Sequence, residues 1–314
     1  MSNDNNNGGG NSDDYSFYPY DPSIAVAGLS CGLFGAALLW STFMTIKTRS
    51  WIWIVQLVTI IMELVGYASR IASAKDNTNL TLYALQFCLI ILAPIIMAGA
   101  IYVVFGRIVF HVIPAQDRTT GLLWIPPRWI TPIFVTFDIV SLIVQLIGAA
   151  VVAATRPTDD NAANNLNMGK NVALAGLAIQ IAAFGLFSII AVRFHFISQR
   201  FEHSLQSRLA VAKGREAEIN TKWRFLLYAV NISCLFVLIR SVYRVVEFAQ
   251  GPLGVVTQKE FYMYVLDALP VFLVTLAFCV IFPGSFLPHM GFRVPKNRGE
   301  ELGSDGSTLE FREI

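Results

Sequence analysis

Residues 223–248 have the sequence WRFLLYAVNISCLFVLIRSVYRVVEF, an apolar run with Arg240, Arg244 and Glu247 near its end. At about 1.5 Å per residue, a helix of this length crosses the roughly 30 Å hydrocarbon core of a bilayer. Arg240, Tyr243 and Glu247 lie on one helix face with Arg244, because they are spaced by three, four and seven residues. We interpret this polar face as a functional site, since a charge inside a bilayer costs at least about 2.5 kcal/mol. The alternative is a set of ion pairs that only holds helices together.

The composition is that of a polytopic membrane protein: 55% of the 314 residues are apolar and 14% are charged. A formal net charge of +2 is too small to indicate a nucleic-acid partner. The four cysteines lie in apolar runs, with no close pair and no neighbouring histidine. We therefore predict neither a metal site nor a redox dithiol, and no cofactor.

Seven apolar windows are long enough to span a membrane, so we predict an all-α fold with seven transmembrane helices in one bundle. The predicted spans are about 24–46, 51–72, 81–108, 129–152, 172–194, 223–248 and 262–282. They form one transmembrane domain, residues 24–290. The flanking segments, 1–23 and 291–314, are rich in Gly, Ser, Asn or acidic residues and are predicted to be disordered tails.

The basic residues predict the orientation of the bundle. Of the 23 Lys and Arg residues, 16 lie in loops one, three and five and the C-terminal tail, and four lie in the loops on the other side. Positive residues in short loops stay on the cytoplasmic side, so the N-terminus is predicted outside and the C-terminus in the cytoplasm. Asn79 would then be an external glycosylation acceptor, although it adjoins the third span closely.

Two glycines in the first predicted span, Gly28 and Gly32, are four residues apart. Small residues at this spacing allow a neighbouring helix to approach closely. We therefore expect the first span to pack tightly on this face.

A second polar face lies in the second span, where Glu63, Tyr67 and Arg70 again share one side of the helix. Here the acid precedes the arginine along the chain, whereas in the sixth span Arg240 precedes Glu247. Both spans are predicted to cross the membrane in the same direction. Axial offsets of about 8 Å separate Glu63 from Arg240 and Arg70 from Glu247, at 1.5 Å per residue. A single axial shift of one helix relative to the other would therefore bring both oppositely charged pairs together. This predicts the ion pairs Glu63–Arg240 and Arg70–Glu247.

The fourth span adds Asp138 and, on the same face, Gln145, and the last span adds Asp267. We expect these groups to converge on a polar chamber between spans two, four, six and seven, in the outer half of the bilayer. Such a chamber suits an amphiphile whose cationic or zwitterionic headgroup meets a carboxylate. The predicted ligand-contacting residues are Glu63, Tyr67, Arg70, Asp138, Gln145, Arg240, Tyr243, Arg244, Glu247 and Asp267.

Several of these motifs together resemble the fungal lipid-translocating exporter family, the RTA-like proteins associated with aminocholesterol resistance. The resemblance covers about residues 24–290 and rests on Glu63 to Arg70, Ala93–Pro94 through Tyr102 to Gly106–Arg107, Phe137–Asp138 with Gln145 and Gly148, and residues 240–248. It implies export or transbilayer movement of amphiphiles such as sphingoid long-chain bases, and resistance to toxic amphiphiles. Some relatives are linked to porphyrin or haem traffic. The expected location is the plasma membrane, with the vacuole or endoplasmic reticulum as alternatives.

Two other functions are alternatives to transport. A seven-helix zinc hydrolase is disfavoured because all four histidines lie at or beyond the ends of the spans, so we predict that the chain is not an enzyme. A seven-helix lipid sensor or receptor has the same topology and remains the alternative to a transporter. Proton coupling is permitted by the buried carboxylates.

Overall fold

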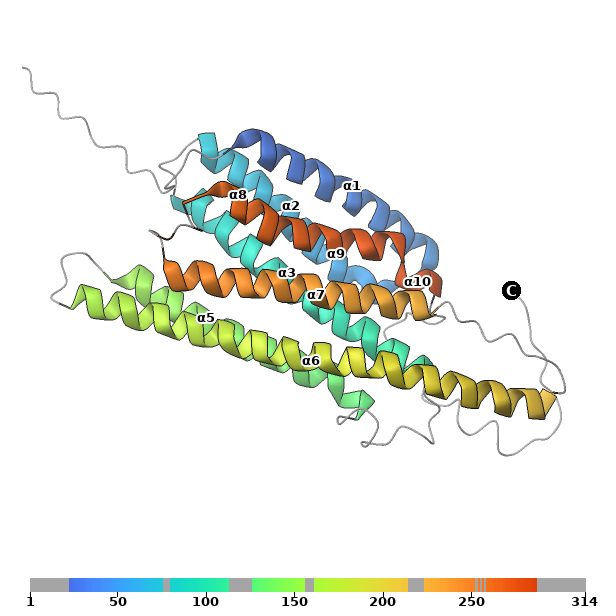
Figure 1. Cartoon of the computed structure of the whole chain (residues 1–314). Coiled ribbons are helices and arrows are strands. Elements are labelled where there is room, and N and C mark those ends of the chain that lie inside the picture. Colours follow the sequence, from blue (N-terminus) through green and yellow to red (C-terminus); the bar gives the residue numbers. More distant parts are fainter. Residues whose placement is uncertain are drawn as a thin grey trace, which may run out of the picture.

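The computed structural model describes residues 23–75, 80–112, 126–155, 161–213, 223–251 and 258–286, together with residues 254 and 256 (Figure 1). Apart from Ser23, the two predicted tails lie outside the described residues. Asn79 also lies outside them, so its predicted glycosylation stays a prediction.

The described residues contain helices and no strand. Six long helices are continuous: α1 (Ile24–Thr48), α2 (Ile54–Lys75), α3 (Leu80–Val112), α5 (Pro127–Ala154), α6 (Ala162–Lys213) and α7 (Trp223–Gln250). A short turn, η1 (Trp51–Trp53), precedes α2. The last span is assembled from α8 (Glu260–Met263), the π-helical turn η3 (Tyr264–Ala268) and α9 (Leu269–Val280), and is followed by α10 (Pro283–Phe286).

Seven of the described segments are long and apolar enough to cross a membrane, which confirms the predicted fold class. The fifth span differs most from its predicted limits. It was expected over 172–194, but α6 begins at Ala162 and continues without a break to Lys213. The polar residues beyond Phe194 therefore extend the membrane helix itself.

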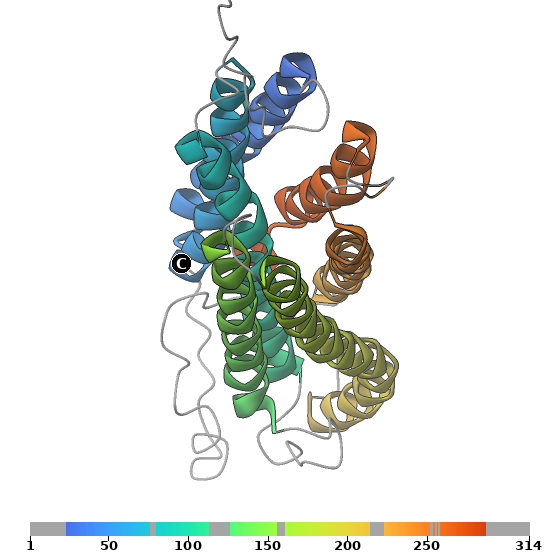
Figure 2. The same cartoon turned by 90° about the vertical axis from the view of Figure 1, so that its left-hand side faces the viewer.

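The helices pack in a ring. Each neighbours the next in the order α1, α2, α3, α5, α6, α7 and α9, and α9 returns to α1 (Figures 1 and 2). A further contact joins α3 to α7 across the middle of the ring. This contact divides the bundle into two halves, one formed by α1, α2 and α9 with α3 and α7, and the other by α5 and α6 with the same two helices.

The outer surface of the bundle is apolar. Large side chains such as Leu39, Phe196 and Val280 are more than half exposed. Inside, aromatic rings fill the space around α3, where Tyr102 and Phe187 have ring centroids 4.5 Å apart. A surface this apolar is stable in lipid and unstable in water, which fits helices that cross a bilayer.

Close packing between α5 and α6 depends on glycine. A Cβ atom on Gly148 would lie 2.5 Å from the backbone nitrogen of Ala173, and one on Gly176 would lie 2.8 Å from the carbonyl oxygen of Ser141. Gly28 and Gly32 have no such neighbour, since nothing lies within 4 Å of a Cβ built on either. The expectation of tight packing at Gly28 and Gly32 is therefore wrong.

The π-helical turn η3 lies immediately before Pro270, the second residue of α9. Proline has no N–H, and its ring clashes with the carbonyl group of the preceding turn in a regular α-helix. A wider turn relieves that clash. Asp267 lies within this turn, so the irregularity determines where its carboxylate is placed.

Candidate functional site

A buried cluster of charges joins α7 to η3. Arg240 Nε lies 2.8 Å from Asp267 Oδ1, and Arg244 Nε donates a hydrogen bond of 3.1 Å to the same oxygen. A second Arg244 nitrogen, Nη2, pairs with Asp267 Oδ2. Arg244 also forms an ion pair of 2.8 Å with Glu247, whose carboxylate accepts a hydrogen bond of 3.3 Å from Tyr243. Two guanidinium groups are thus balanced by two carboxylates.

A second charged group lies where α2 meets the start of the last span. Arg70 Nη2 is 2.7 Å from Glu260 Oε1, and Arg70 Nε donates a 3.2 Å hydrogen bond to the hydroxyl of Tyr264. The backbone N–H of Ser23, just before α1, donates to both oxygens of Glu260. Glu260 therefore ties together the beginnings of two spans and the end of a third.

These pairs differ from the predicted ones. The expected partner of Arg240 was Glu63, and that of Arg70 was Glu247, but the partners are Asp267 and Glu260. The physical reason is that the last span supplies a carboxylate to both α2 and α7. The axial positions of residues on α2 and α7 contain no information about the carboxylates of the last span.

Glu63 is left without an ion pair or hydrogen bond. Its side chain is buried, and neither carboxylate oxygen has a partner among the described residues. It interacts electrostatically with Asp267, Arg240 and Arg244, so it faces the cluster without joining it. Tyr67, one turn further along α2, is also buried with an unpartnered hydroxyl.

The two candidate residues of α5 lie in the other half of the bundle. Gln145 donates a 3.0 Å hydrogen bond to Gln180 of α6, and both line a small cavity of about 20 Å³ with Arg240 and Arg244. A space of this size holds about one water molecule. Gln145 therefore lies close to the charged cluster.

Asp138 is separate from that cluster. It is buried next to the hydroxyl of Tyr102 on α3, yet neither carboxylate oxygen forms a hydrogen bond of normal geometry. The single predicted chamber is thus two sites: one between α2, α7 and the last span, and one between α3 and α5. The interhelical contact between α3 and α7 lies between them.

Sequence reasoning missed Glu260, Tyr264, Tyr102 and Gln180 as polar neighbours of the site. Glu260 and Tyr264 precede Asp267 by seven and three residues, so they share its helix face. Extending that face outward by two turns would have found them. The predicted start of the last span at residue 262 excluded Glu260.

No group of three or more His, Cys, Asp and Glu side chains that could hold a metal ion occurs among the residues that the structure describes. The charged cluster consists of arginine and carboxylate side chains that neutralise one another. This cluster can stabilise the packing of α7 against the last span. A ligand can bind to its charged groups only by replacing one partner of an existing ion pair.

A model of the family described as RTA1 like protein matches residues 56–290, a stretch that includes all ten predicted site residues and the ion pairs of both buried charged groups. The chain belongs to the RTA1-like family. The resemblance inferred from the sequence motifs is thereby confirmed, and with it the assignment of this chain as a multi-pass membrane protein.

Curated relatives of this RTA1-like chain occur in Saccharomyces cerevisiae. Protein RTA1 is 35% identical over 222 residues, which cover 71% of this chain and 62% of that protein. Protoporphyrin uptake protein 1 is 33% identical over 230 residues, covering 73% of this chain and 67% of the relative. Sphingoid long-chain base transporter RSB1 is 27% identical over 292 residues, covering 83% and 73%. The match thus spans less than two thirds of the first of these relatives.

Two of these RTA1-like relatives are named for transport or uptake, and neither name describes an enzymatic reaction. No solved structure matches the chain.

Proposed function

We propose that this chain moves amphiphilic lipids with a cationic headgroup across or out of the bilayer. Sphingoid long-chain bases and related toxic amphiphiles are the proposed ligands, resistance to them is the proposed outcome, and the plasma membrane is the proposed location. The name of a relative that transports sphingoid bases supports the ligand class. The buried acids of this chain support it independently.

The observation that carries the proposal is the buried carboxyl group of Asp138, which lies beside the Tyr102 hydroxyl and forms no ion pair with any described residue. A buried charge without a partner is costly, so a bound cation would stabilise it. Tyr102 lies beside Asp138 and also interacts with Cys234 of α7, which in turn contacts Ser188 of α6. These polar side chains lead from the interior acid towards the outside of the bundle.

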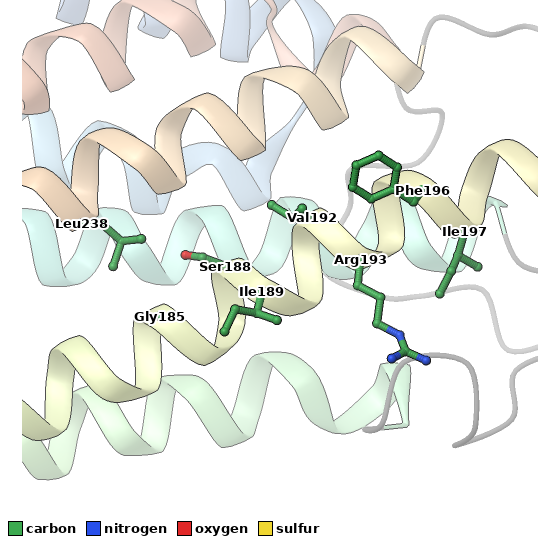
Figure 3. A pocket seen from close by; sticks show the side chains of 8 residues that line it. All are labelled: Gly185, Ser188, Ile189, Val192, Arg193, Phe196, Ile197 and Leu238. Atoms are coloured by element: carbon green, nitrogen blue, oxygen red, sulfur yellow. The ribbon is translucent and has the colours of Figure 1, made fainter.

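Ser188 lies at a groove of about 780 Å³ on the bilayer-facing side of α6 and α7 (Figure 3). In Figure 3, the Ser188 side chain points towards Leu238, and Arg193 extends away from both. Most of the lining is apolar, with Val192 and Leu238 contributing to it. We propose that a lipid chain occupies this groove while its headgroup is directed towards Asp138.

The charge pattern favours a cationic ligand over a porphyrin, although one relative is named for protoporphyrin uptake. Protoporphyrin carries two carboxylates and would need unpaired cations. The buried arginines at the two charged groups, Arg70, Arg240 and Arg244, each already hold a carboxylate. Among the described residues, the buried acids without an ion pair are instead Glu63 and Asp138.

The proposal is tested by reconstituting the purified chain in liposomes and measuring the transbilayer movement of a fluorescent sphingoid base. Movement faster than in protein-free liposomes, and faster than that of a fluorescent porphyrin, is expected. A lipid sensor would instead bind the base without moving it, and would change lipid distribution only in cells. Binding without movement would therefore replace the transporter by the sensor.

A further inference from the structure

Glu63 occupies an unusual electrostatic position. Its side chain is 1% exposed, and both carboxylate oxygens lack hydrogen-bond partners among the described residues. Arg240 and Arg244 face it from α7, and Asp267 faces it from η3. On α2 itself, the Tyr67 hydroxyl is the nearest titratable group, and it too has no partner.

The surroundings of Glu63 are otherwise apolar or closely packed. The Tyr67 ring stacks between Phe34 of α1 and Tyr264 of η3, at centroid distances of 5.8 and 6.3 Å. On the α3 side, a Cβ atom on Gly66 would lie 2.9 Å from Ile90. None of the described residues donates a hydrogen bond to either carboxylate oxygen of Glu63.

The charges around Glu63 already balance without it. Arg240 and Arg244 are neutralised by Asp267 and Glu247. If Glu63 were ionised as well, this buried group would carry one uncompensated negative charge. An isolated buried carboxylate is strongly unfavourable, so the group is stable either with Glu63 protonated or with one additional cation present.

Further buried polar groups lie on the same side of α2 as this acid. Gln56 lies seven residues before Glu63, on the same helix face, and neither its amide nitrogen nor its amide oxygen has a partner. The indole N–H of Trp53, at the start of α2, is likewise buried and unpartnered. Buried polar atoms are normally satisfied by protein or by water. Trp53, Gln56 and Glu63 thus form a line of buried polar groups without hydrogen-bond partners along one face of this segment.

We propose that Glu63 is a second headgroup site, distinct from Asp138, that holds a proton in the empty protein and releases it when the cationic headgroup of an amphiphile binds. The Glu63 O–H bond breaks, its proton passes to water, and the carboxylate forms an ion pair with the headgroup. No oxidant or other reactant is required. This inference rests on the proposed function, because it takes its ligand class from it, and it predicts that a proton gradient drives transport.

The direct test is infrared spectroscopy of the purified full chain in lipid nanodiscs. A protonated carboxylic acid has a C=O stretching band that an ionised carboxylate lacks. The wild-type spectrum is expected to contain such a band that is lost in Glu63→Gln and diminished by added sphingosine. Asp138→Asn is the matched control, since it removes another unpaired buried acid and leaves the Glu63 band in place. A spectrum without a Glu63 band at neutral or acidic pH would overturn the proposal.

Flux in liposomes separates this inference from the proposed function. Wild-type movement of the sphingoid base is expected to respond to an imposed pH gradient, and movement by Glu63→Gln is expected to lose that response. Movement by the wild type that is indifferent to the gradient would overturn the proton exchange and leave the transporter intact. If no variant moved the base, the proposed function would fail, and the response of the infrared band to sphingosine would still decide whether Glu63 exchanges its proton.

Discussion

Arg244 of α7 holds Asp267 of η3 through two hydrogen bonds, one to each carboxylate oxygen. The two residues are 23 positions apart in the chain and belong to the last two spans. Paired hydrogen bonds of this kind fix the orientation of both side chains as well as their distance. Because Asp267 lies in the π-helical turn before Pro270, this contact connects the irregular part of the last span to the rigid helix α7.

Replacing Asp267 is expected to destabilise the bundle strongly. Asp267→Asn leaves Arg240 and Arg244 with too little negative charge, and breaking a buried pair from one side costs about 3–5 kcal/mol. Thermal unfolding in detergent would measure the loss. Glu247→Gln is the control, because Glu247 is more exposed and neutralises only Arg244. Equal effects of the two changes would contradict the central position given to Asp267.

Exchange of charge between Arg70 and Glu260 should preserve folding. In the wild type, Arg70 Nη2 and Glu260 Oε1 are 2.7 Å apart. Each single change, Arg70→Glu or Glu260→Arg, puts two like charges at these neighbouring positions, whereas the double change restores a pair of opposite charges. A coupling of about 0.5–3 kcal/mol is expected in a double-mutant cycle. The same exchange between Arg70 and Glu247 should give no recovery of stability in the double variant. Recovery there would support the Arg70–Glu247 ion pair predicted from the sequence instead of the Arg70–Glu260 pair.

Alanine at Gly148 is expected to destabilise the contact between α5 and α6. Its Cβ would lie 2.5 Å from the nitrogen of Ala173, so the helices must separate, at a cost of about 1–3 kcal/mol. Gly28→Ala is the matched control, because its Cβ meets nothing within 4 Å. We expect its melting temperature to be unchanged or slightly raised, since alanine favours helix formation. A greater loss at Gly28 than at Gly148 would contradict the observed packing.

Filling the groove between α6 and α7 is expected to slow movement of the sphingoid base. Val192→Trp puts a large side chain where the lipid chain is proposed to lie. Leu29→Trp makes a similar change on the exposed face of α1, away from the groove, and should leave movement unchanged. Both variants should fold normally because both positions face lipid. Equal rates for Val192→Trp and the wild type would argue against the groove as the lipid-chain site.

Much of the fold could be predicted from the sequence because a bilayer imposes a simple requirement. Every span must be long and apolar, and this rule identified all seven. Limits of the spans were less predictable. The polar residues of α6 beyond Phe194 continue the helix, because helix formation there does not depend on hydropathy.

The pairing within the site could not be predicted from periodicity. Periodicity along a helix shows which residues share a face, as it did for Glu63 and Arg70, but not which helix that face meets. The three-dimensional packing places the last span beside both α2 and α7, so its acids Asp267 and Glu260 take the arginines. The same limit applies to glycine: Gly28 and Gly148 look alike in sequence, and only the packing distinguishes them.

The most direct test of the account is the rate at which Asp138→Asn moves a fluorescent sphingoid base in liposomes that contain no other protein, compared with the wild type at equal amounts of folded chain. Asparagine keeps the shape of the side chain and removes its charge. The account predicts that the wild type moves the base and that Asp138→Asn, equally stable, moves it far more slowly. Equal movement by the two proteins would contradict a transport site built on this unpaired acid.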